Sequence, residues 1–271
     1  MIRDPSGMSA RVALIGAGRW GRRLLPPLRE RFEVPVCVTT GGTEGVEWLR
    51  REGIGATTDL DAVLLDPTLD AVAIATPMDS HAALAGRALA AGKHVFVEKP
   101  LATSAVDARR VAAAAGDLVL FVGHVYLYHP LLAGFRGNPV RSARLTWRKH
   151  GTFDSDLFWN LASHDVSIAL ALFGEAPSQI DVPVSERDHA RIRLGFPGGR
   201  EAVVDIDRTS SERVKTIALD GGRILDLTQG DPLQRELAAF AAAVEHGEPF
   251  PSDAAHAVAV VETVERIRDA A

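Results

Sequence analysis

Three glycines near the start of the chain, Gly16, Gly18 and Gly21, have the spacing G-x-G-x-x-G. The apolar run Val12 to Ile15 precedes them and helix-forming residues follow, so the order of strand, tight turn and helix predicts a dinucleotide-binding turn. Gly16 lets the chain turn off the strand, Gly18 lets backbone N–H groups approach a pyrophosphate, and Gly21 lets the helix pack closely on the strand. The alternative is an ordinary strand–turn–helix unit whose glycines only shape the turn.

The end of the second expected strand, residues 34–40, bears on which dinucleotide binds. An acidic residue about 20 positions after the glycines normally holds the adenosine ribose of NAD. Here the strand ends in Thr39 and Thr40, and no carboxylate follows until Glu44. Small hydroxyl side chains tolerate a 2′-phosphate, and three arginines are candidates to lie nearby: Arg19, Arg22 and Arg23. The pattern favours NADP; alternatively the threonines only end the strand and either cofactor binds.

A lysine follows another buried strand directly, in the sequence Glu98-Lys99-Pro100. Ligands of open α/β sheets bind beyond the carboxyl ends of the strands, so we expect Lys99 to face the cofactor crevice. Pro100 restricts the backbone at this point. The alternative is a lysine on a surface loop.

Further polar side chains lie in the second half of the chain. Asn160 and His164 are four residues apart in an expected helix and therefore share a face, where both could meet one small molecule. Histidine is the usual proton carrier near neutral pH, although His164 could equally pack in the core. Asp165, on another face, either orients a partner or is solvated. Tyr126 and Tyr128 at the domain junction either bind a polar ligand or pack there.

Composition limits the remaining possibilities. The 271 residues correspond to one large or two ordinary domains, and the net charge of −5 gives no indication of a nucleic-acid or anionic-membrane partner. No apolar run approaches the roughly 20 residues of a membrane span, and residues 1–10 read as a polar tail without the apolar core of a signal peptide. Cys37 is the only cysteine, which excludes an intrachain disulfide or a cysteine-cluster metal site. We expect a cytoplasmic protein without a bound metal.

The first half of the chain alternates strands with helices, which predicts a doubly wound parallel sheet over residues 1–123. Strands are expected at 12–15, 34–40, 54–57, 71–75, 94–97 and 118–122. Helices are expected at 20–31, 43–52, 80–91 and 107–115, with Pro26 and Pro27 kinking or ending the first. Asp59 should cap a further helix.

The second half, residues 124–271, follows an antiparallel pattern. A short helix is expected at 130–135, strands at 140–150, 179–184, 190–196, 201–208 and 214–220, a loop at 153–160, and helices from there to 173 and at 232–246 and 253–268. The fold class is therefore α/β, with an N-terminal Rossmann domain and a C-terminal α+β domain built on an open, mainly antiparallel sheet. The last helices could pack back on the first domain.

Four features in this order resemble the Gfo/Idh/MocA family of NAD(P)-dependent oxidoreductases: the glycine motif, Ala75-Thr76-Pro77 followed by His81, Glu98-Lys99-Pro100-Leu101, and the helix near His164-Asp165. The run Pro232 to Phe240 followed by Gly247-Glu248-Pro249 is similar to the closing helices of that family. The segment 123–130, with residues 160–165, looks most like members that act on nucleotide sugars, particularly at C3.

The resemblance implies hydride transfer between a nicotinamide and a secondary alcohol or ketone of a sugar, with NAD or NADP as cofactor. It implies that Lys99 is the active-site lysine and His164 the proton-transferring histidine, with Asn160 where many members have Asp. It also implies homo-oligomers formed through the C-terminal sheet. The cofactor-binding residues expected from the motifs are Gly16, Gly18, Arg19, Trp20, Gly21, Thr39, Thr40, Ala75, Thr76, Pro77, His81, Glu98 and Lys99. The expected substrate-binding residues are Tyr126, Tyr128, Asn160 and His164.

Two other functions stay open from the sequence. One is reduction of a C=N bond in a small-molecule pathway, with Tyr126, Tyr128 or His124 as proton donor. The other is a nucleotide-binding sensor or scaffold without turnover, since a fold does not determine a function. A sensor would need the glycine turn, but it would not need both Lys99 and His164.

Overall fold

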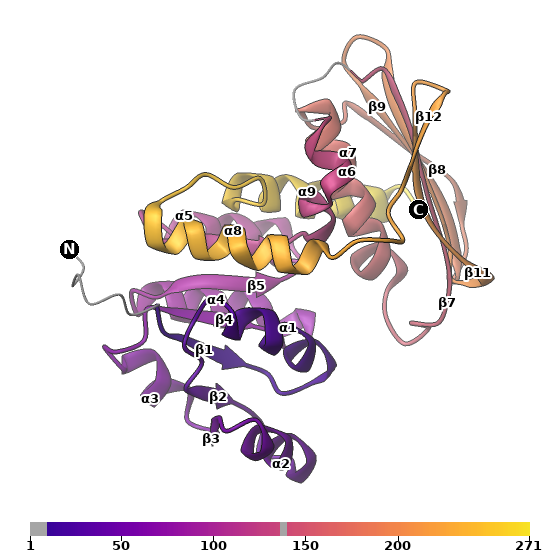
Figure 1. Ribbon diagram of the computed structural model, residues 1–271. Helices are drawn as coiled ribbons and strands as arrows, with labels where there is room; N and C mark the ends of the chain where they lie inside the picture. The colour runs from indigo at the N-terminus through magenta and orange to yellow at the C-terminus, as the bar shows by residue number, and fades with distance from the viewer. Residues whose placement is uncertain (1–9, 136–139) are drawn as a thin grey trace.

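Short apolar strands that alternate with helices form the first domain in the computed structural model, which describes residues 10–135 and 140–271 (Figure 1). The sheet has the order β3-β2-β1-β4-β5-β6 with every pair parallel. Its strands are β1 Val12–Ile15, β2 Val36–Val38, β3 Gly55–Thr57, β4 Ala71–Ile74, β5 His94–Glu98 and β6 Leu120–Gly123. Its helices are α1 Arg19–Arg29, α2 Thr43–Arg51, α3 Leu60–Leu65, η1 Met78–Ser80, α4 His81–Ala90 and α5 Ala105–Ala114.

The second domain is a six-stranded sheet of order β12-β11-β7-β10-β9-β8 with helices on one face (Figure 1). Its strands are β7 Ser142–His150, β8 Gln179–Ser185, β9 His189–Phe196, β10 Arg200–Asp207, β11 Thr209–Leu219 and β12 Arg223–Asp226. Its helical segments are η2 Val125–Tyr128, α6 Pro130–Ala133, η3 Phe158–Ala162, α7 Ser163–Phe173, α8 Pro232–His246 and α9 Ala254–Asp269. The pairing is antiparallel except between β7 and β10, which run parallel.

The two closing helices connect the domains. Phe240 of α8 lies against Phe96 of β5 and Phe121 of β6, with ring centroids 5.5–5.6 Å apart in all three pairs. Each of the three rings is fully buried, and burying such a side chain stabilises a fold by roughly 1.5–3 kcal/mol. Helix α9 packs between α5 of the first domain and α7 of the second. The first domain is therefore completed by residues from the end of the chain.

Several boundaries differ from the sequence predictions. Helix α1 continues past Pro26 and Pro27 to Arg29. The burial of Leu24, Leu25 and Leu28 stabilises the helix by more than the loss of two N–H donors destabilises it. The loop predicted at 153–160 is wrong at its end, since a π-helical turn begins at Phe158. Strand β12 was absent from the sequence predictions.

The predicted cap by Asp59 is confirmed, because its carboxylate accepts from the Ala62 N–H. The tail predicted at residues 1–10 lies, except for Ala10, outside the described residues. Among the residues that the structure describes, none of the helices has the length and apolar character needed to cross a membrane.

Candidate active site

The glycine turn between β1 and α1 leaves room only for glycine at two of its three positions. Gly16 has φ +109°, and a Cβ there would lie 2.5 Å from the Ala75 carbonyl oxygen. A Cβ on Gly21 would lie 1.9 Å from the Gly16 carbonyl oxygen. A Cβ on Gly18, in contrast, would meet no atom within 4 Å. The turn therefore packs tightly against the sheet and is open above Gly18, where backbone donors at the start of α1 can receive a phosphate.

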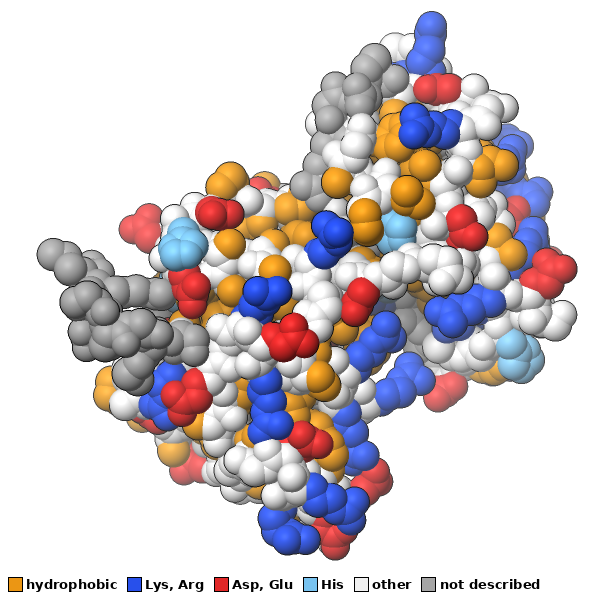
Figure 2. Space-filling view, in the orientation of Figure 1, with side chains coloured by type: hydrophobic (Ala, Val, Ile, Leu, Met, Phe, Trp, Pro, Cys, Tyr) orange, Lys and Arg blue, Asp and Glu red, His pale blue; other side chains and the backbone are white. Residues whose placement is uncertain are grey.

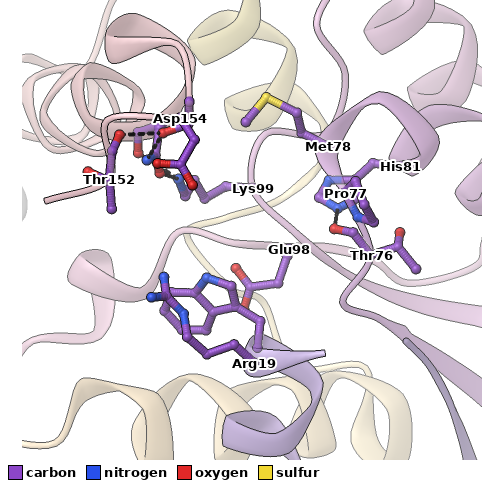
Figure 3. Close-up of a pocket in the computed structure, with 12 residues that line it drawn as sticks. Arg19, Thr76, Pro77, Met78, His81, Glu98, Lys99, Thr152 and Asp154 are labelled. Carbon is purple, nitrogen blue, oxygen red and sulfur yellow. Dashed lines mark hydrogen bonds between the residues drawn. The ribbon is translucent and has the colours of Figure 1, made fainter. Parts of the chain in front are cut away.

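A cavity of about 390 Å³ opens beside this turn, between the two domains (Figure 3). The first domain contributes the ends of β4 and β5 and the start of α1, and the second domain contributes the loop after β7 and the π-helical turn. The lining residues are Arg19, Trp20, Thr76, Pro77, Met78, His81, Glu98, Lys99, Thr152, Asp154, Ser155 and Asn160. An open glycine turn beside a cavity at the carboxyl ends of parallel strands is the arrangement at which open α/β sheets bind dinucleotides.

His81 connects the two strand ends that form the floor of the cavity. Its Nδ1 is 2.8 Å from the Pro100 carbonyl oxygen and its Nε2 is 2.9 Å from the Thr76 carbonyl oxygen. Burial lowers the pKa of His81, and a neutral ring donates only one of these hydrogen bonds at a time. The side chain thus holds the loop after β4 to the loop that carries Lys99, whose bond to Pro100 is cis.

Lys99 crosses the domain boundary. Its Nζ donates to the backbone oxygen of Asn160 at 2.6 Å and to the Asn160 Oδ1 at 3.3 Å. The Asn160 amide nitrogen donates in turn to the Ser155 Oγ at 2.6 Å, and Ser155 Oγ donates to the Thr152 carbonyl oxygen (Figure 3). Asn160 lies within the π-helical turn, a local widening that is frequent at functional sites. The wider turn presents the Asn160 backbone oxygen to Lys99.

Arg208 anchors the loop that closes this side of the cavity. It is buried, and its Nη1 donates to the carbonyl oxygens of Thr152 and Ser155, both at 2.7 Å. Its Nε also donates to the Asp188 carboxylate at 2.8 Å. The local sequence pattern indicates only that Arg208 ends a strand and gives no sign of its loop partners.

Glu98 and Lys99 are adjacent titratable groups at the carboxyl end of β5. Burial raises the pKa of Glu98 to about 7, an effect that the Lys99 charge opposes. Burial lowers the pKa of Lys99 to about 8, opposed by Glu98 and assisted by the positive charge of Lys149. Both groups therefore titrate close to neutral pH, which suits proton exchange and the stabilisation of a developing negative charge.

His164 lies one turn beyond Asn160, in a cluster of rings behind the cavity and not among its lining residues. Its ring centroid is 5.2 Å from that of Tyr126 and 5.3 Å from that of Trp147. Its Nδ1 is buried and has no hydrogen-bond partner among the described residues. Burial, together with the charges of Lys99 and Lys215, lowers the pKa of His164 well below its ordinary range. The ring is therefore neutral near pH 7, and its surroundings make it a weak base.

A buried ion pair lies directly behind this cluster. Lys215 Nζ is 2.5 Å from Asp165 Oδ1, and the two side chains are 4% and 1% exposed. The ammonium also lies over the rings of Trp147, at 3.8 Å, and Tyr126, at 5.0 Å. Asp165 of α7 is therefore not solvated, because Lys215 reaches it from the face of β11 that the helices cover. Lys215 could not be recognised as the partner of Asp165 from the sequence, because the two residues are 50 positions apart in the chain.

The two tyrosines at the domain junction lie outside the cavity lining and pack in different clusters. Tyr126 packs in the His164 cluster, whereas Tyr128 is stacked on Phe121 and its hydroxyl is 2.7 Å from the Ser252 Oγ. His124 is buried next to His256. The structure brings neither Tyr128 nor His124 into the cavity lining, and the packing alternative describes Tyr128.

At the other end of the crevice, Thr39 and Thr40 follow β2 as expected. Thr39 Oγ1 faces Gly45 of α2, where an added Cβ would be 3.5 Å away. Of the three candidate arginines, Arg22 reaches this region: its guanidinium is 2.8 Å from the Glu44 carboxylate and 5.3 Å from the Trp48 ring centroid.

Comparison with known proteins agrees with this geometry. A family model for the Gfo/Idh/MocA oxidoreductases, described as an NAD-binding Rossmann fold, matches residues 10–124. A curated relative, UDP-N-acetylglucosamine 3-dehydrogenase from Acidithiobacillus ferrooxidans, is 37% identical over 179 residues, which are 63% of this chain and 56% of that protein. The match to the family model covers the nucleotide-binding domain, and the similarity to the curated relative extends beyond it.

Two solved structures share the fold of both domains. The structure of the Acidithiobacillus ferrooxidans enzyme GnnA superposes with a TM-score of 0.87 at 22% identity, covering 97% of this chain and 98% of that one. GenD2 from gentamicin A biosynthesis, in complex with NAD, has a TM-score of 0.84 at 25% identity and covers 100% and 97% of the two chains. In sequence, the chain matches about half the length of the curated relatives.

Proposed function

We propose that the protein is an NAD(P)-dependent oxidoreductase that interconverts a secondary alcohol and a ketone on a sugar or nucleotide sugar. The observation that carries the proposal is the position of Lys99, which lies in a cavity between the open glycine turn and the second domain and forms a hydrogen bond across the domain boundary. A bound nicotinamide would supply or accept the hydride. The relatives support the substrate class, because their names include a UDP-sugar 3-dehydrogenase, a dTDP-sugar 3-reductase and an inositol 2-dehydrogenase.

In this proposal Lys99 donates a hydrogen bond to the reacting oxygen of the substrate and stabilises the negative charge that develops there. Asn160 orients the ammonium through its two oxygens. His164, which is neutral and lies behind the cavity lining, takes up the hydroxyl proton during oxidation and returns it during reduction through one bridging water molecule. The Thr152–Ser155 loop, held by Arg208, excludes water from one side of the cavity.

The test is a panel of sugars and nucleotide sugars, incubated with the purified protein and NAD⁺ or NADP⁺ while absorbance at the nicotinamide band is followed. The panel includes UDP-N-acetylglucosamine, UDP-glucose, glucose and myo-inositol, together with keto-sugars and imines in the reverse direction. The proposal predicts turnover of at least one hydroxyl substrate or keto-sugar. Turnover of imines alone would replace it with C=N reduction, and cofactor binding without turnover of any class would favour a sensor.

We propose NADP as the cofactor. Thr39 and Thr40 at the end of β2 have hydroxyl groups, and no carboxylate stands at these two positions. The Arg22 guanidinium is a nearby cation for a 2′-phosphate, since it lies 2.8 Å from the carboxylate of Glu44 at the start of α2. A 2′-phosphate there could compete with Glu44 for the guanidinium. Titration of protein fluorescence with NADH and NADPH measures the preference. Tighter binding of NADPH is expected, and it should disappear in Arg22→Gln; tighter binding of NADH would overturn the proposal.

We propose that the protein is a cytoplasmic homo-oligomer assembled through the face of the second sheet that its helices leave uncovered. On this face Asp205 of β10 is only 4% exposed, and Arg191 of β9 donates to its carboxylate at 2.6 Å. This ion pair gives the face an ordered polar surface for a partner subunit. Light scattering coupled to size-exclusion chromatography tests the assembly. A particle of about 29 kDa, the mass of one chain, would contradict it.

A further inference from the structure

Side chains on the inner face of the second sheet change from apolar to cationic along neighbouring strands β7 and β11. Trp147 is paired with Lys215, and Leu145 with Ile217 in the deeper core. Two residues beyond Trp147 on β7, alternation places Lys149 on the same face. Arg213 lies two residues from Lys215, in the part of β11 where the register shifts between Thr209 and Val214. Its charge acts on Lys149 and on Tyr126 of the His164 cluster, so Arg213 lies near both side chains. The strands therefore carry two further cations from the His164 cluster towards the first domain.

Neither of these cationic side chains has an ion-pair partner among the described residues. Within residues 10–135 and 140–271, the side chains of Lys149, Arg213 and Arg19 form no ion pair or hydrogen bond. Lys149 is only half-exposed, and the charged groups that act on it, Arg19, Arg213 and Arg208, are all positive. Burial and this repulsion together lower the pKa of Lys149. Figure 2 shows Lys and Arg side chains gathered in the hollow where the two domains meet.

Such an arrangement is unfavourable in the absence of an anion, because like charges repel and a half-buried ammonium loses hydration. The carboxylates that line the neighbouring cavity, Glu98 and Asp154, form no ion pair with the three cations in the described structure. One monovalent group would leave two of the cations unmatched, whereas a phosphate or diphosphate can accept hydrogen bonds from several at once.

We propose that Lys149 and Arg213, assisted by Arg19, bind the diphosphate of a nucleoside-diphosphate sugar and so place its sugar ring at Lys99. This inference rests on the proposed oxidoreductase function and specifies its substrate class. Lys149 lies close enough to Lys99 for its charge to act on it, which connects the anion site to the cavity. The pyrophosphate of the cofactor has its own position at the glycine turn, so the two residues from the second domain are assigned to the substrate and Arg19 is shared.

The experiment measures binding of UDP, inorganic pyrophosphate and uridine by calorimetry to the full-length protein saturated with NADPH or NADH. The variants are Lys149→Gln, Arg213→Gln and the double variant. Arg110→Gln is the matched control, since Arg110 is exposed on α5 and lies outside the cavity lining and outside the second sheet. A lost charged hydrogen bond reduces affinity by about tenfold or more. We expect that loss for UDP in each single variant, a larger loss in the double variant, and no change for Arg110→Gln.

Three outcomes would overturn the inference. The first is that UDP and pyrophosphate bind no more tightly than uridine. The second is that the control variant lowers the affinity for UDP as much as Lys149→Gln does. The third is that the variants lower the affinity for NADPH and leave that for UDP unchanged, which would assign the cations to the cofactor. Because these are binding measurements, failure of the oxidoreductase proposal would appear separately, as UDP binding without turnover. Conversely, turnover of a neutral sugar without UDP binding would retain the enzyme and refute the anion site.

Discussion

The ion pair between Lys215 and Asp165 leads to a sharp prediction about stability. Both side chains are almost completely buried and their charged atoms are 2.5 Å apart. Removing one partner of such a pair leaves an uncompensated charge in the interior and typically costs about 3–5 kcal/mol. Lys215→Met should therefore lower the free energy of unfolding by about that amount, and Asp165→Asn by a similar amount. The double variant should lose much less than the sum, because it removes both charges together.

Urea unfolding followed by tryptophan fluorescence measures the four proteins of this double-mutant cycle. Trp147 lies 3.8 Å from the Lys215 ammonium, so it reports on the pair directly. The matched control is the exposed pair Arg87–Asp61, whose side chains are 48% and 78% exposed. Arg87→Met should cost no more than about 1 kcal/mol. If Lys215→Met costs as little as Arg87→Met, or if the losses in the cycle are additive, the buried pair does not hold α7 to β11 and the reasoning is refuted.

Other consequences can be tested with single changes. Phe240→Ala should destabilise the first domain by about 3–5 kcal/mol in urea unfolding, although the residue lies near the end of the chain; the exposed Leu65→Ala should have little effect. Glu98 has a folded pKa of about 7 against an ordinary 4.5, so the folded state holds more protons between these values and stability should fall as pH rises through them. Glu98→Gln should remove that decline, of the order of 3 kcal/mol, when unfolding is compared at pH 5 and pH 7.5; an unchanged pH dependence would exclude Glu98 as its cause. Arg208→Gln should free the loop at residues 151–156, seen as faster cleavage there by a protease specific for acidic residues, and equal cleavage rates would contradict its anchoring role.

The sequence predicted the features that depend on near neighbours along the chain. The turn at Gly16 and Gly21 follows from backbone sterics that only glycine satisfies, and the position of Lys99 follows from the rule that parallel strands end at one edge. The strands of the first domain were recognised from their apolar runs because both faces of that sheet are covered.

Features that depend on distant pairing could not be predicted. Lys215 and Asp165 meet only because β11 lies beside β7 beneath α7, and neither residue has a local pattern that indicates a partner. The widened turn at Asn160 has no sequence signal, since an α-helix and a π-helix use the same residue types. The proximity of Lys149 and Arg213 could not be predicted either, because it depends on the pairing of β7 with β11.

The central claim is that Lys99 acts on the substrate oxygen within a site that binds the cofactor independently of it. The most direct measurement compares wild type and Lys99→Met, determining NADPH and NADH affinity by fluorescence titration and turnover with a substrate that the wild type oxidises or reduces. Cofactor affinity should stay within about threefold, and turnover should fall by about a hundredfold or more. Near-normal turnover in the variant would contradict the claim and remove Lys99 from the reaction.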